Sequence, residues 1–179
     1  MDRRLVDLLD RQDIWDCLMR YARGVDRLDA DLVRSAFWPD AHDSHGRWNG
    51  TPENFLAHWL PTQVDRVAGQ HFIANHSVEL ESPTGAHAES YFLVASLPRG
   101  RARLDLTGGR YLDRFEKRDE HWRIATRLVL VDWQTTGDSS AMATNLATSF
   151  RGSRGRDDPS YERPLRPRHQ TPAAAGEPT

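Results

Sequence analysis

The chain has 179 residues, enough for one domain with a proper core but too few for two sizeable domains. Lys and Arg number 24 against 26 Asp and Glu, so the basic footprint typical of nucleic-acid-binding proteins is absent. Cys17 is the single cysteine, which excludes an internal disulfide and any multi-cysteine zinc or iron–sulfur site. No apolar run reaches membrane-spanning length, and the N-terminus lacks the apolar region of a signal peptide. We therefore expect a cytoplasmic protein without nucleic-acid or membrane partners, in which Cys17 is a buried, inert thiol.

A first helix is predicted over residues 11–25. Ile14, Leu18, Tyr21 and Val25 recur at the spacing of one helix face. This run marks the side of the helix that packs on the rest of the domain.

Two shorter helices are predicted next. Asp29 is a plausible N-cap for residues 30–38, and Thr51 is a plausible N-cap for residues 51–60. The segment between them, residues 39–50, is rich in turn residues and is predicted to be a loop.

After residue 68 the hydrophobic period changes from 3.6 to two, which is the period of strands. Four long strands are predicted, at residues 70–82, 86–97, 102–118 and 121–134. Gly108 and Gly109 inside the third of them indicate a bulge that bends the sheet. Helices followed by an antiparallel meander indicate an α+β fold, a cone-shaped barrel of three helices on a strongly curved, mostly antiparallel sheet.

The composition changes to Arg, Pro, Gly and Asp near residue 151. We therefore divide the chain into one domain, residues 1–150, and a C-terminal tail, residues 151–179. The tail is expected to be partly disordered or to pack on a neighbouring subunit.

Three side chains outside the loop are candidates for chemistry. Asp26 lies at a helix end, where the macrodipole disfavours an acid, so it is a candidate for a functional role. His71 begins a strand and by alternation shares a face with Ile73, whereas His76 falls on the opposite face. Arg127 has apolar neighbours and needs an anionic partner, either in a structural ion pair or in a substrate.

The loop places Asp40, His42, Asp43 and His45 within six residues. Such side chains can bind metal, but their spacing fits no strong signature and no further ligands complete a set. We predict a polar pocket rim or an entrance strand here, and no metal.

These motifs together resemble the SnoaL-like members of the nuclear transport factor 2 superfamily, over about residues 5 to 135. The segments that carry the resemblance are YARGVDRLDADLVRSAFWPDA, HFIANHSVEL, AHAESYFLV and GGRYLDRFEKRDEHWRIATRLVLVDW. The motifs are most similar to those of three cofactor-free lyases: scytalone dehydratase, hexachlorocyclohexane dehydrochlorinase and bile-acid 7α-dehydratase.

The resemblance implies a catalytic Asp–His dyad. Asp26 matches the aspartate, His71 the histidine and Tyr21 the residue five positions before the aspartate, while Arg127 matches a pocket arginine. In this arrangement Asp26 fixes the tautomer of His71, His71 removes a proton, and Tyr21 assists the leaving group. The histidine that scytalone dehydratase carries on a later strand has no clear counterpart, and the general acid stays open.

The resemblance thus predicts a lyase that needs no cofactor and acts on a hydrophobic cyclic or aromatic small molecule, such as a dehydratase or an aromatic-dimer lyase. A homotrimer or homodimer is expected. The predicted substrate contacts are Arg127, His45, Asp43, Tyr91, Trp38, Trp59 and Asn75.

Other functions are compatible with the same fold. An isomerase or hydrolase would use the same pocket. A non-catalytic binding or assembly subunit would not need Asp26 and His71 in contact. A β-subunit-like partner of an aromatic-ring dioxygenase would require a large α-subunit and an apolar docking face.

Overall fold

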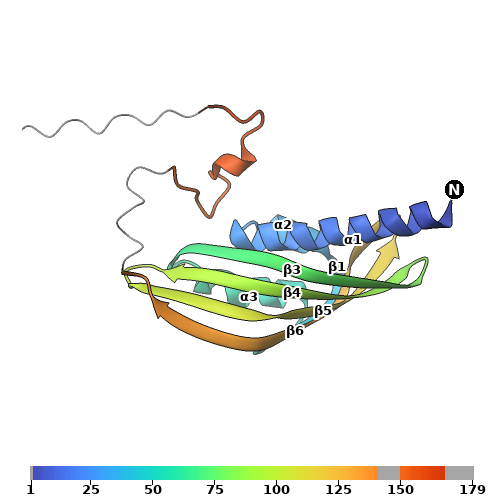
Figure 1. The fold of residues 1–179 in the computed structure, drawn as a ribbon, viewed down its shortest axis with the longest axis horizontal. Coiled ribbons are helices and arrows are strands. Elements are labelled where there is room, and N and C mark those ends of the chain that lie inside the picture. Colours follow the sequence, from blue (N-terminus) through green and yellow to red (C-terminus); the bar gives the residue numbers. More distant parts are fainter. Residues whose placement is uncertain (1, 141–149, 168–179) are drawn as a thin grey trace, which may run out of the picture.

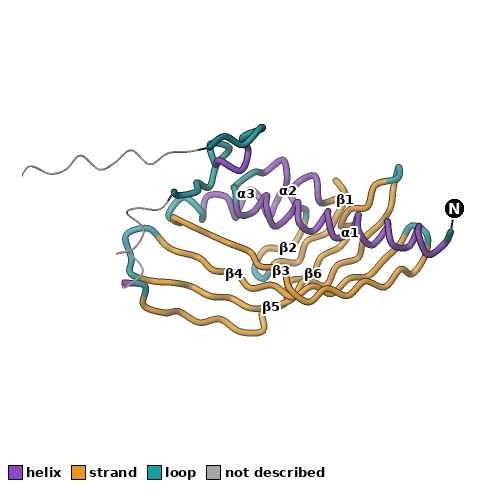
Figure 2. Tube along the Cα trace, turned by 45° about the horizontal axis from the view of Figure 1, so that its top comes forward, coloured by secondary structure: helices purple, strands orange, loops and turns teal. Residues whose placement is uncertain are grey.

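The computed structural model describes residues 2–140 and 150–167 of the chain. Three helices, α1 (Arg3–Asp26), α2 (Ala30–Ala36) and α3 (Pro52–Thr62), pack on one six-stranded sheet. The sheet is mixed and curved, and it does not close into a barrel (Figure 2). The predicted α+β class, with three N-terminal helices, is confirmed.

The sheet has the spatial order β2-β1-β6-β5-β4-β3, so β2 and β3 form its edges. All neighbouring strands are antiparallel except β1 and β6, which run parallel. Figure 1 shows α1 running alongside β3, and the two elements are in contact. The strands are β1 (Phe37–His45), β2 (Trp48–Gly50), β3 (Arg66–Ser82), β4 (Gly85–Pro98), β5 (Arg103–Arg118) and β6 (His121–Asp138).

The prediction of a loop over residues 39–50 was wrong. This segment forms the hairpin β1–β2, and β1 begins at Phe37, where a helix was expected. Gly46, with φ of 66°, lies in its turn. Pairing of β1 with β6 supplies backbone hydrogen bonds that local turn propensity cannot reveal, so tertiary context decided this segment.

The helix starts follow the predicted capping residues. The Asp29 carboxylate accepts a hydrogen bond from the backbone N–H of Leu32 at 3.3 Å. The Thr51 hydroxyl accepts one from the backbone N–H of Asn54, also at 3.3 Å. These bonds satisfy amides that have no partner within the helix, which fixes where α2 and α3 begin.

The sheet contains several bulges, and two of them involve residues singled out from the sequence. The register between β5 and β6 shifts at Gly108 and Gly109, where a bulge was predicted, but the extra residue, Asp132, lies on β6. A second shift, between Ile73 and His76 in β3, was not predicted. Because this bulge adds a residue, His76 turns to the side that carries His71, which corrects the simple alternation expected from the sequence.

The core lies between the helices and the inner face of the sheet. Cys17 is fully buried there, as predicted, and burial raises the pKa of its thiol to about 11. The largest wholly buried apolar side chains are Tyr21, Tyr111, Phe37, Phe115, Ile14, Leu18, Leu56, Ile124 and Val33.

No helix among the described residues is both long and apolar enough to cross a membrane.

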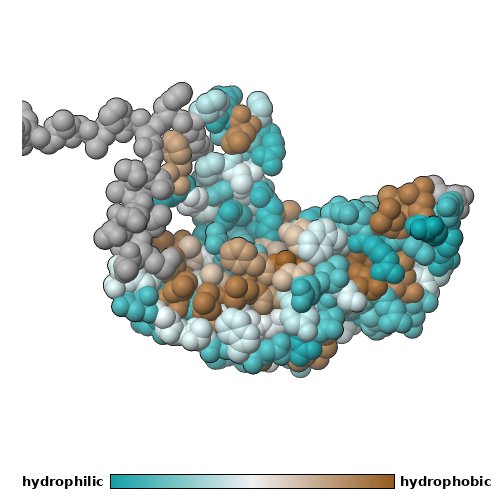
Figure 3. Space-filling model, in the orientation of Figure 1, coloured by the Kyte–Doolittle hydropathy of each residue, from teal (hydrophilic) through white to brown (hydrophobic). Residues whose placement is uncertain are grey.

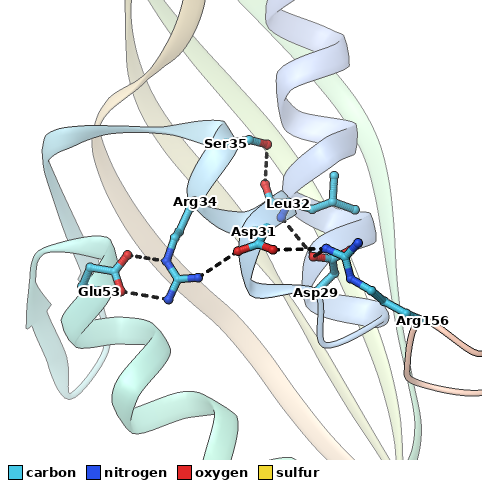
Figure 4. Close-up of polar contacts among 7 residues, drawn as sticks. All are labelled: Asp29, Asp31, Leu32, Arg34, Ser35, Glu53 and Arg156. Carbon is cyan, nitrogen blue, oxygen red and sulfur yellow. Dashed lines mark hydrogen bonds and ion pairs between the residues drawn. The ribbon is translucent and has the colours of Figure 1, made fainter.

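The described part of the tail, residues 150–167, lies against its own chain, at the end of α1 and the start of α2. Arg156 contacts Asp29 at 2.9 Å and Asp31 at 3.2 Å. Figure 4 shows Arg34 continuing this network from Asp31 to Glu53 of α3. The tail thus has a docking place within the same protomer, while residues 168–179 lie outside the described part.

Candidate active site

A cavity of about 610 Å³ lies between α3, the β1–β2 hairpin, the inner face of the sheet and the C-terminal segment. Its wall combines apolar side chains with charged ones, among them Arg66, Asp105 and Arg154. This volume suits a small organic ligand. The lining residues are His45, Gly46, Arg47, Trp48, Trp59, Thr62, Gln63, Arg66, Gly69, His71, Phe92, Val94, Ser96, Asp105, Thr107, Tyr111, Val129, Val131, Gln134 and Arg154.

His71 lines this cavity and contacts Asp26. Its Nδ1 lies 2.7 Å from Oδ1 of Asp26, and its backbone N–H donates to both carboxylate oxygens at 3.1 Å. The two side chains are mostly buried, with 13% and 17% of their surfaces exposed. Two separate donors of one residue therefore hold the carboxylate, and Nε2 of His71 is the nitrogen left for a ligand.

Arg154, from the C-terminal segment, supports the end of α1 that carries Asp26. Its guanidinium donates to the backbone carbonyls of Val25 at 3.3 Å and Asp26 at 3.2 Å, and to the side chain of Gln63 at 3.2 Å. A cation at this place offsets the negative end of the helix dipole. The positive charge of Arg154 therefore offsets the unfavourable position of Asp26 at the C-terminal end of α1.

Tyr21 and Arg127 lie behind the cavity wall rather than in it. Arg127 is fully buried and donates two hydrogen bonds of 2.7 Å to Asp113. Its guanidinium carbon lies 4.2 Å from the ring centroid of Tyr21 and 4.1 Å from that of Tyr111, and these two rings pack edge to face. Neither Tyr21 nor Arg127 lines the cavity, so the structure does not place these two predicted site residues where they could touch a ligand in it.

Tyr111 is the member of this cluster that reaches the cavity. Burial raises the pKa of its phenol, and of the Tyr21 phenol, well above the usual range. Tyr111 therefore stays protonated and can donate a hydrogen bond to a ligand. Alternation on β5 places Tyr111 and Asp113 on one face, a signal that could have found it.

His45 and Asp43, both predicted substrate contacts, lie on the inner side of β1. His45 lines the cavity, and its ring stacks on Phe55 with centroids 4.6 Å apart. Asp43 is fully buried, and its Oδ2 lies 3.7 Å from Nδ1 of His45. The structure therefore brings the two side chains together but gives only His45 access to the cavity.

The remaining predicted contacts separate into two groups. Trp59 of α3 lines the cavity. Trp38 instead donates to the carbonyl of Glu116 at 3.0 Å, outside the cavity. Tyr91 points to the outer face of β4 and is 43% exposed, and Asn75 lies exposed at the β3 bulge, so the structure does not place these three predicted contacts at the cavity.

Several cavity residues were missed because they come from segments without a local signal. Arg154 belongs to a tail whose composition predicts no structure, and nothing in the sequence indicates that it folds back.

Among residues 2–140 and 150–167, no group of three or more His, Cys, Asp or Glu side chains is arranged to hold a metal ion.

The sequence profile of the SnoaL-like domain matches residues 6–128. The chain belongs to the SnoaL-like family. This family lies within the nuclear transport factor 2-like superfamily, and the resemblance predicted from the sequence is confirmed. A search of curated proteins gave no significant match.

Solved structures share this SnoaL-like fold at low sequence identity. A scytalone dehydratase-like protein from Novosphingobium aromaticivorans has a TM-score of 0.68 and 17% identity, covering 73% of this chain and 89% of its own. Hexachlorocyclohexane dehydrochlorinase type 3 from Novosphingobium barchaimii has a TM-score of 0.67 and 19% identity, covering 75% and 94%. A Mycobacterium tuberculosis protein of unknown function has a TM-score of 0.63 and 22% identity, covering 83% and 86%. At these identities the similarity establishes the fold alone.

Proposed function

We propose that the protein is a lyase that eliminates a leaving group from a hydrophobic cyclic or aromatic small molecule, without a cofactor. The observation that carries this proposal is the contact between Asp26 and His71 at the wall of the cavity. The dehydratase and dehydrochlorinase names of two structural neighbours point to the same reaction class.

The chemistry begins with His71. Asp26 accepts the Nδ1–H bond, which leaves Nε2 unprotonated and available to take a proton from a carbon atom of the substrate. The imidazolium formed in this step is stabilised by the carboxylate that already contacts it. Removal of the proton next to a carbonyl or an aromatic ring leaves an electron pair that can expel a group from the neighbouring carbon.

The cavity wall supplies the rest of the site. Phe92, Val94, Val129 and Trp59 provide apolar surface for a ring. This surface excludes water and strengthens the polar interactions of His71. Tyr111 can donate a hydrogen bond to an oxygen of the substrate, which is where negative charge develops after proton removal.

Two classes of substrate fit this reaction. One is a hydroxylated ring that loses water, and the other is an aromatic dimer whose side chain is cleaved. In both, an acidic C–H bond lies next to the bond that breaks, so the same base serves both reactions.

The experiment uses a bicyclic probe in deuterated water. Its β-hydroxy ketone is part of a ring that is fused to a benzene ring. We expect the protein to accelerate both exchange of the acidic C–H proton and loss of water, followed by NMR. His71→Gln should abolish both, whereas His87→Gln, an exposed histidine on β4, should keep both. Equal rates for the His71→Gln variant and the unmodified protein would refute the lyase proposal, and exchange without elimination would replace it with an isomerase.

We also propose a homodimer or homotrimer. Hydrophobic side chains gather on the surface over β3 and β4 (Figure 3), and Val67, Phe72 and Tyr91 are 49%, 52% and 43% exposed. Exposed apolar surface of this kind favours association between subunits. Light scattering after size-exclusion chromatography tests this directly, and a monomer at all concentrations would refute it.

A further inference from the structure

Asp43 is a buried carboxylate without a hydrogen-bond partner. It lies on β1, its side chain has no exposed surface, and neither of its two oxygens has a partner among the described residues. Buried carboxylates in folded proteins are paired with donors, because a bare charge in the interior is strongly unfavourable. A donor close to Asp43 must therefore supply the missing bond in the working protein.

His45 is a neighbour that can supply it. Its Nδ1 is also buried and without a partner, and it lies 3.7 Å from Oδ2 of Asp43. The two residues are two positions apart on one strand, so their side chains point to the same side. A small rotation of the His45 ring against Phe55 would bring Nδ1 within hydrogen-bond distance of the carboxylate.

Arg127 is the competing partner. It faces Asp43 across the parallel pairing of β1 and β6, and its Nη1 is buried and unpartnered. However, its Nε and Nη2 are already engaged by Asp113. One positively charged guanidinium then faces two buried carboxylates, those of Asp43 and Asp113. A proton on His45 would balance the negative charge that remains.

His45 has the position that a proton donor needs. Its ring lines the cavity that His71 also lines, and the two histidines come from different strands, β1 and β3. With Nδ1 directed at Asp43, Nε2 is the nitrogen available to a bound molecule. The cavity therefore has two imidazole rings, each with a carboxylate on its Nδ1 side.

We propose that His45 is the general acid of the elimination and that Asp43 is its positioning residue. This inference rests on the proposed lyase function. Nε2 of His71 first takes the proton from carbon and leaves an enolate, and the electron pair of the enolate then forms the new double bond. The bond from the adjacent carbon to oxygen breaks, and the departing oxygen takes the proton of His45 Nε2 and leaves as water. His71 has then gained one proton and His45 has lost one, and exchange with solvent restores both.

The test compares two leaving groups on one carbon skeleton. A hydroxyl group needs a proton to depart, whereas chloride leaves as a stable anion. We use the β-hydroxy ketone fused to a benzene ring and its β-chloro analogue as probes, with uncatalysed loss subtracted. His45→Gln should lose roughly 10²-fold or more in water elimination, the usual range for a general acid, and about fivefold or less in chloride elimination.

His42→Gln is the matched control. His42 lies on the same strand, is exposed, and contacts Asn49 at 2.6 Å, away from the cavity. It should leave both rates unchanged. Equal losses for both leaving groups in His45→Gln, or no loss, would overturn the role of His45.

The two proposals fail in different ways. In His45→Gln, the C–H exchange catalysed by His71 should persist even when the elimination of water is slow. If the lyase proposal itself is wrong, the His71→Gln variant will exchange the proton as fast as the unmodified protein.

A second measurement needs no substrate. Nitrogen NMR of the resting protein should show a proton on His45 Nδ1, and Asp43→Asn should shift the two His45 ring nitrogens while those of His71 stay in place. His45 signals that do not respond to Asp43→Asn would overturn the assignment of Asp43.

Discussion

Arg127 and Asp113 form a wholly buried ion pair with two hydrogen bonds of 2.7 Å, and neither side chain has any exposed surface. Burial alone would lower the pKa of Arg127, but the Asp113 carboxylate outweighs this effect and raises it. The guanidinium thus stays charged, and it contacts the rings of Tyr21 and Tyr111, which also pack edge to face against each other. This pair connects β5 and β6 directly behind the cavity.

The first prediction concerns the stability that depends on this pair. Arg127→Met leaves Asp113 buried without its countercharge, and breaking a buried pair costs about 3–5 kcal/mol. Urea unfolding should show this loss of free energy of unfolding. Arg110→Met is the control, because Arg110 and Asp132 form an ion pair at the surface, where solvent screens the charges. A loss for Arg127→Met no larger than that of the control would show that the pair is dispensable.

The second prediction concerns Gly109, at the bulge between β5 and β6. A β-carbon at Gly109 would lie 2.1 Å from the carbonyl oxygen of Leu130 and 2.6 Å from the ring of Phe92. Because backbone cannot yield as a flexible side chain can, Gly109→Ala should destabilise the fold by about 1–3 kcal/mol. Gly137→Ala on β6, where a β-carbon meets nothing within 4 Å, should change the free energy of unfolding little. Similar thermal midpoints for the two variants would contradict this explanation of the glycine.

The third prediction concerns acid and the C-terminal segment. Burial by itself raises the pKa of Asp158, but hydrogen bonds from Ser160 and Ser153 and the charge of Arg27 outweigh it and lower the pKa to about 2. A carboxyl whose pKa is lower in the folded protein stabilises it fully above the unfolded pKa and loses this contribution as the pH falls through the folded value. Docking of residues 150–167 should therefore weaken between about pH 4 and pH 2.

Hydrogen exchange of the Ser153 and Ser160 amides measures this docking, because both donate to Asp158. Asp158→Asn should expose these amides already at neutral pH. Asp157→Asn should keep them protected, because the neighbouring Asp157 accepts a hydrogen bond from the Ser153 hydroxyl and not from either of these amides. Protection that is unchanged at pH 2 in the unmodified protein would count against the role of Asp158.

Most of the architecture followed from local patterns. The change from a period of 3.6 to a period of two separated helices from strands, and Asp29 and Thr51 located the starts of two helices. The hairpin β1–β2 was missed because its strand character comes from pairing with β6, which lies some eighty residues away in the chain. The β3 bulge was missed because no glycine marks it.

The site was predictable where a residue type conflicted with its local setting. Asp26 at a helix end and Arg127 on an apolar strand each indicated a distant partner, and His71 and Asp113 are the partners in the structure. Trp38 could not be assigned, because an aromatic side chain in a core and one at a pocket have the same local pattern. Arg154 could not be found from the sequence, since its place depends on how the whole tail docks.

The most direct test of the central claim is the rate of C–H exchange catalysed by the Asp26→Asn variant. The amide keeps the shape of the carboxylate but cannot stabilise the imidazolium of His71, so the rate of exchange of the β-hydroxy ketone should fall roughly 10²- to 10⁴-fold. Circular dichroism should show an unchanged fold, and Asp13→Asn, an exposed acid on α1, should have the rate of the unmodified protein. An Asp26→Asn variant that exchanges the proton within about twofold of the unmodified rate would contradict the account, because general-base catalysis that depends on the pair should lose far more.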